Sequence, residues 1–157
     1  MFREMRRNKQ LMSKEETEKV MERNSNGVMA CLGDDDYPYA VPFNYVYYNE
    51  KIYFHSAKEG HKLDSITKYP KVSFAVVDKD QIVSEEYTSY FRSAIAFGKA
   101  RIVEGEEWVE AFEVLVEKYS GDRPEEEKAK EIRECGRSHI IAIDVEHITG
   151  KEAKELV

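Results

Sequence analysis

The chain has 157 residues, 41% of them hydrophobic and 35% charged, and a formal net charge of −7 at pH 7. This length suits one domain with a sizeable core over residues 1–157, with 1–12 as a candidate flexible arm. The negative balance argues against a nucleic-acid partner, and no apolar run approaches the length of a membrane span. The basic start lacks the apolar segment of a signal peptide, so we expect a cytoplasmic protein.

The first half reads as one helix followed by strands. Ser13-Lys14-Glu15-Glu16 is a capping box, which satisfies free N–H groups at a helix start. The stretch 39–48 is rich in aromatic and β-branched residues, which favour strands. Pro42 within it gives no N–H to a ladder, so this strand is expected at an edge, a bulge or a barrel mouth. The predicted elements are a helix over 13–24 and strands over 27–33, 39–48 and 51–54.

The second half contains a long strand and a clear amphipathic helix. Small residues alternate along 94–100, which suggests close approach by another layer, a subunit or a ligand. Trp108 and Phe112 share one face of a helix at core-packing spacing. The predicted elements are a helix over 63–68, a strand over 71–77, a turn at 78–80, a short helical turn at 84–86, a strand over 88–103, helices over 106–119 and 124–134, and a strand over 138–148.

These elements contain six strands without a βαβαβ rhythm, which excludes a doubly wound parallel sheet. We expect a mainly β protein with flanking helices (α+β), built on a six-stranded, mainly antiparallel barrel.

The two cysteines, Cys31 and Cys135, have no CxxC spacing, and His and Cys do not group as metal ligands. The sequence therefore predicts no metal site. Cys31 lies in an apolar strand and is expected to be a buried, unreactive thiol. Cys135 ends the predicted 124–134 helix, where it could be exposed.

The segment 55–62 is crowded with groups that can hold a phosphate. A helix start offers free N–H groups, a lysine adds a full charge, and a glycine lets the backbone come close. A solvated basic connection is the alternative, because the segment matches no strict phosphate-loop consensus. The residues concerned are His55, Ser56, Lys58, Gly60, His61 and Lys62.

Five segments, in order, resemble the pyridoxamine 5′-phosphate oxidase-related, FMN-binding split barrels. The resemblance is closest to the branch that contains the nitroimidazole-resistance (Nim-type) proteins, and it spans most of the chain. The segments are Tyr37–Val46, Tyr53–Lys62, Pro70–Phe74, Tyr90–Ala100 and Asp144–Lys151.

The resemblance implies FMN as the cofactor and a homodimer with flavin sites at the subunit interface. His55 matches the histidine implicated in function in the Nim-type branch, although a structural role is equally open. Other members of the branch have an arginine near the position of His61-Lys62, so the phosphate ligand is open as well. The implied cofactor-binding residues are Val41, Pro42, Phe43, Asn44, His55, Ser56, Ala57, His61 and Lys62, with Thr88, Ser89 and Tyr90 from the second subunit and His147, Thr149 and Lys151 as weaker candidates.

The function implied is that of an FMN-dependent oxidoreductase. It would take a hydride from a nicotinamide donor and reduce a small oxidised molecule, such as a nitroaromatic. A non-catalytic flavin-binding module for storage, sensing or electron transfer is one alternative. A relative that binds haem or a deazaflavin is another, and the residues alone do not separate the three.

Overall fold

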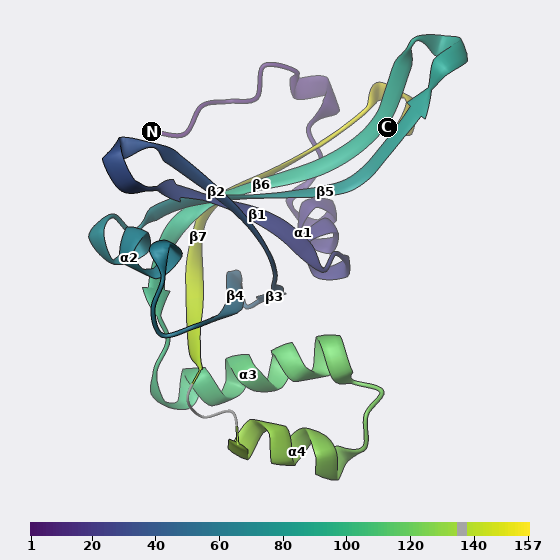
Figure 1. Ribbon diagram of the computed structural model, residues 1–157. Coiled ribbons are helices and arrows are strands. Elements are labelled where there is room, and N and C mark those ends of the chain that lie inside the picture. Colours follow the sequence, from purple (N-terminus) through teal and green to yellow (C-terminus); the bar gives the residue numbers. More distant parts are fainter. Residues whose placement is uncertain (135–137) are drawn as a thin grey trace.

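The computed structural model describes residues 1–134 and 138–157. In these residues, seven strands form one antiparallel sheet in the order β2-β1-β5-β6-β7-β4-β3 (Figure 1). The strands are β1 (Asn26–Leu32), β2 (Pro38–Asn44), β3 (Val46–Tyr48), β4 (Lys51–Ser56), β5 (Lys71–Val83), β6 (Thr88–Ile102) and β7 (His139–Glu152). The helices are α1 (Lys14–Arg23), α2 (His61–Lys68), α3 (Gly105–Ser120) and α4 (Glu125–Glu134), with 3₁₀ turns η1 (Asn8–Gln10), η2 (Asp34–Asp36), η3 (Ser84–Glu86) and η4 (Lys154–Leu156).

The expected mainly β fold with flanking helices is confirmed, but the strand count is seven rather than six. The predicted strand over 39–48 is two strands, because Tyr45 leaves the ladder. Its ring is fully buried and its hydroxyl donates a hydrogen bond to the carbonyl of Met21. The chain thereby crosses from one edge strand of the sheet, β2, to the other, β3, which makes the barrel split.

Two apolar clusters hold the helices to the sheet. One fills the barrel and includes Phe54 and Phe74, both fully buried. The other lies between α3 and the strands β3, β4 and β7 and includes Phe112. Trp108 is partly buried, stacks on Phe112 with ring centres 5.1 Å apart, and donates from Nε1 to the carbonyl of Ser138. The predicted packing of this helix through Trp108 and Phe112 is confirmed.

The prediction of a turn at 78–80 is wrong. β5 continues through a bulge between Val77 and Lys79 and runs on to Val83, so the chain reverses only at η3. The ribbon over residues 78–92, called the hairpin below, projects beyond the barrel (Figure 1). Asp78 explains the difference, because its buried carboxylate accepts hydrogen bonds from Arg23, Asn24 and Arg92.

The small-residue face of β6 lies inside the barrel. A Cβ on Gly98 would lie 2.1 Å from the carbonyl oxygen of Asp144, so the close approach is by β7 of the same chain. A subunit or ligand is therefore not what these small residues contact. The opposite face of β6 carries Ile95 and Phe97, and both side chains are exposed.

None of the helices in the described ranges is long and apolar enough to cross a membrane. The same ranges contain no group of three or more His, Cys, Asp or Glu side chains that could hold a metal ion. Cys31 is 5% exposed, and burial raises the pKa of its thiol, as expected for a core cysteine. The expectation for Cys135 falls outside the described residues.

Candidate functional site

Helix α2 begins at His61, two residues earlier than predicted, directly after Gly60. Gly60 has φ +145°, a conformation that favours glycine, and no described side chain caps the helix start. The first N–H groups of α2 therefore have no side-chain acceptor, and the positive end of the helix dipole faces outward. A Cβ added at Gly60 would meet no atom within 4 Å, so the approach to this helix start is open.

Lys62 lies over aromatic rings at the mouth of the barrel. Its Nζ is 5.3 Å from the ring centre of Phe43 and 5.5 Å from that of Phe54, and the two rings stack 3.9 Å apart. The side chain is partly buried rather than exposed, and burial lowers the pKa of its ammonium group. No carboxylate within residues 1–134 and 138–157 forms an ion pair with it. A partly desolvated cation beside uncapped N–H groups favours an anionic ligand.

His61 contacts the turn between β1 and β2. Its ring stacks on Tyr39 with centres 4.2 Å apart, and Nε2 accepts the backbone N–H of Asp34 at 3.2 Å. One ring nitrogen is therefore already occupied within the chain.

The β2 residues that were grouped by resemblance lie on two faces. Val41 and Phe43 pack against the barrel core, whereas Pro42 and Asn44 face outward. The expected edge position of the strand with Pro42 is confirmed, since β2 pairs only with β1 among the described strands. Its free edge leaves backbone groups available for a ligand or another chain.

His55 and Lys62 do not face each other. Successive strand residues point to opposite faces, so His55 points away from Phe54 and towards α3, where its ring centre is 5.7 Å from that of Phe112. Ser56 is 8% exposed and its hydroxyl donates to the carbonyl of Ala57 at 2.9 Å. A hollow of about 320 Å³ is lined by His55, Ser56, Ala57, Lys58 and Ser138.

Thr88, Ser89 and Tyr90 lie in the hairpin, far from α2 within one chain (Figure 1). The Tyr90 hydroxyl donates to Glu86 at 2.7 Å. These three residues can therefore join the 55–62 segment only if a second copy supplies them.

An exposed apolar surface on the sheet was missed by sequence reasoning. Pro42, Val28, Ala75 and Ile95 form one row across β2, β1, β5 and β6, and Val77 and Phe97 flank it. We call this surface the outer face. The signal was in the sequence, because these strands carry apolar residues on both alternating faces rather than on one. Exposed apolar patches are typical of interaction surfaces.

Fold and site together define a split antiparallel barrel whose mouth is covered by a cationic helix start. The chain belongs to the pyridoxamine 5′-phosphate oxidase family, whose family model matches residues 13–152. The resemblance stated from the sequence is thereby confirmed. No curated protein matches the chain.

Several solved structures share the fold. The conserved hypothetical protein Rv2991 of Mycobacterium tuberculosis has a TM-score of 0.81 and 21% identity, over 98% of this chain and 92% of its own. A protein of Bacteroides thetaiotaomicron described as a candidate 5-nitroimidazole antibiotic resistance protein has a TM-score of 0.74 and 22% identity, over 90% and 86%. A FAD-binding protein of Mesorhizobium loti has a TM-score of 0.65 and 24% identity, over 92% and 97%. At these identities the likeness establishes the fold.

Proposed function

We propose that the chain is a flavoprotein that binds FMN, with the flavin phosphate at the start of α2. The observation that carries the proposal is Lys62, a partly buried ammonium without an ion-pair partner in the described residues, next to uncapped helix N–H groups. A phosphate there would accept from these N–H groups and form a charge-assisted contact with Lys62. Ser56, at the end of β4, is the candidate hydroxyl donor.

The free edge of β2 suits the polar edge of the flavin ring. Its backbone groups and the exposed amide of Asn44 offer the donors and acceptors that a flavin ring needs. The phosphate and ring contacts would thus come from α2 and from the edge strand β2, whose Phe43 lies beneath Lys62.

A two-fold dimer completes this proposal. The outer face exposes apolar side chains, and the hairpin carries Ile82 and Tyr87 at 73% and 97% exposure. A two-stranded ribbon is marginally stable on its own, and a second copy packed on the outer part of the hairpin would bury both features. The same pairing would bring Thr88, Ser89 and Tyr90 of one chain towards the flavin site of the other.

The activity we propose is reduction of a small oxidised molecule, a nitroaromatic among the candidates, with a nicotinamide donor. When bound, FMN supplies the redox chemistry. His55 lines the hollow next to Ser56, on the face of β4 opposite to Phe54, so it would serve as a proton donor only to an acceptor that enters from that hollow. The similar structure described as a candidate 5-nitroimidazole resistance protein supports this substrate class by analogy.

The absorption spectrum of the purified protein, before and after addition of FMN, tests cofactor binding. We expect bands of oxidised flavin that bleach when NADH or NADPH is added without oxygen, and turnover when a nitroaromatic follows. A bound flavin that neither donor reduces would support a non-catalytic flavin module. A Soret band with no affinity for FMN would contradict the proposal.

A further inference from the structure

The N-terminal arm, residues 1–11, is fixed at both ends and cationic between them. At its base, Leu11 bridges to Lys151, and the N–H of the next residue, Met12, donates to the carbonyl of Gly150 at 2.9 Å. At its head, Phe2 stacks on His147 with ring centres 4.7 Å apart. The arm is therefore held to the sheet at both ends, and Figure 1 shows it arching over the sheet between them.

The arm is cationic, whereas the protein as a whole is acidic. The arm carries four cations against one acid, although the protein as a whole has a net charge of −7. All four cations are exposed, and none forms an ion pair within the part of the chain that the structure describes. The cations are Arg3, Arg6, Arg7 and Lys9.

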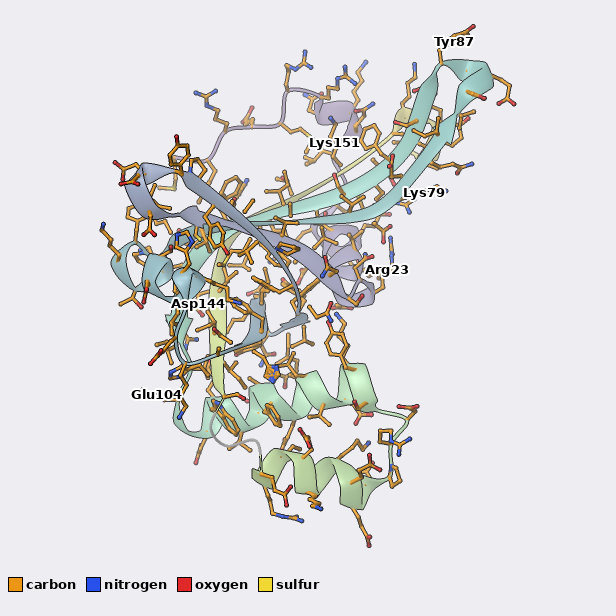
Figure 2. The ribbon with its side chains drawn as sticks, in the orientation of Figure 1. Arg23, Lys79, Tyr87, Glu104, Asp144 and Lys151 are labelled. Carbon is orange, nitrogen blue, oxygen red and sulfur yellow. The ribbon has the colours of Figure 1, made fainter. Side chains whose placement is uncertain are left out.

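The hairpin has the opposite charge. Between the bulge and the start of β6 it carries Asp80, Glu85 and Glu86 against one cation, Lys79. These acids are exposed and form no ion pair with any described residue. Figure 2 shows Lys79 on the lower part of the hairpin and Tyr87 at its tip, pointing into solvent.

We propose that the arm is an intersubunit strap, whose cations pair with the acidic hairpin of a second copy. The inference rests on the proposed dimer. Within one chain, the N-terminus and the hairpin tip lie on opposite sides of the upper part of the molecule in Figure 1, and no arm cation forms an ion pair with a hairpin acid among the described residues. In a two-fold pair, each arm would meet the other copy's hairpin, so that every contact is made twice.

The 55–62 segment is also cationic, but it is a weaker candidate than the arm for pairing with the acidic hairpin of the second copy. Lys58, His61 and Lys62 belong to the segment proposed to hold the flavin phosphate. Acids placed directly on that segment would repel the same anion that the segment attracts, so only Thr88, Ser89 and Tyr90 are assigned to the flavin site, and Asp80 and Glu85 are assigned to the arm. The arm has no such competing ligand, and Phe2 holds it against Phe97, whose ring centre is 5.3 Å away on the outer face.

A charge-swap experiment tests the strap. One variant reverses the arm with Arg6→Glu and Arg7→Glu, and the other reverses the hairpin with Asp80→Lys and Glu85→Lys, which spares Glu86 and its bond to Tyr90. Sedimentation at low salt should show each variant dimerising roughly tenfold or more weakly than the wild type, a change of about 1.4 kcal/mol. An equimolar mixture should form heterodimers of wild-type strength, because both contacts are then attractive. The weakening should shrink in high salt.

A matched control reverses Lys130 and Arg133, two exposed cations of α4, to glutamate, and its dimer should be unchanged. A wild type that is monomeric at all concentrations would overturn the proposed dimer and the strap with it. A wild-type dimer that neither reversal weakens would overturn the strap alone, as would weakened variants that fail to form heterodimers in the mixture.

Discussion

Lys62 and Lys118 are both partly buried, yet their surroundings give them different roles. The Nζ of Lys118 donates to the carbonyls of Asn24 and Tyr45 and lies 4.4 Å from the ring centre of Tyr45. This ties the end of α3 to the link after α1 and to the crossing between β2 and β3. Lys62 has aromatic rings beneath it but no such acceptor among residues 1–134 and 138–157, which leaves its ammonium group available to a ligand.

The free energy of unfolding should depend on pH through the titration of Lys118. Burial lowers the pKa of Lys118 from its ordinary value of 10.5 to about 8, so the folded state binds fewer protons than the unfolded state between these values. Stability should therefore rise with pH over that window. We expect the free energy of unfolding of the wild type, minus that of Lys118→Met, to increase between pH 8 and 10.5. A difference that is flat or falls, measured by urea unfolding across this range, would contradict the assignment.

At the scale of elements, Asp78 is the anchor of the hairpin. Arg23, with Asn24 and Arg92, holds the pKa of this buried carboxyl well below its usual range. The stabilisation is thus present above the ordinary pKa of an aspartate, about 3.9, and is lost as the pH falls below it.

Replacement of Asp78 by Asn should release the hairpin without unfolding the barrel. Hydrogen bonds to charged groups contribute about 1.5–3 kcal/mol, and we expect a loss of about 2–3 kcal/mol at pH 7, since Arg23 remains half exposed to water. Amide hydrogen exchange should accelerate over residues 78–92 and remain slow in β4 and β7. Unchanged protection of the hairpin would show that Asp78 does not hold it.

The elements that local patterns determine were predicted well, and those that depend on distant partners were not. The capping box at Ser13 and the apolar stripe of α3 gave helices close to their observed bounds. The wrong turn at 78–80 and the missed break at Tyr45 share one cause. Asp78 contacts Arg23, and Tyr45 contacts Met21, so the decisive partners lie far away in the sequence.

Residue types and the family resemblance predicted which segments form the candidate site, but not which way their side chains point. The cationic character of 55–62 was visible, as was the edge position of Pro42. His55 faces α3 because side chains alternate along β4. Lys62 covers Phe54 because α2 begins at His61, two residues before the predicted start of this helix. The outer face was not predicted, because apolar residues on both faces of a strand read as a buried strand.

At the scale of the whole molecule, the outer face should control assembly. Ile95 is 43% exposed, so Ile95→Lys should leave the fold of one chain intact but place two charges at the proposed interface. We expect a monomer by sedimentation at micromolar concentration. Val109→Lys on α3 is the matched control, because Val109 is also 43% exposed but lies away from the sheet. A dimer that survives Ile95→Lys would place the interface elsewhere.

The most direct test of the account is a titration of FMN and riboflavin against the wild type and Lys62→Met. Methionine keeps the apolar stem over Phe43 and Phe54 and removes only the charge. Lys68→Met, in the last turn of α2, is the control. We expect Lys62→Met to weaken FMN by about 1.5–3 kcal/mol, or roughly 10- to 150-fold, and riboflavin, which lacks the phosphate, far less. Equal losses for both flavins, or no loss for either, would contradict a phosphate site at Lys62.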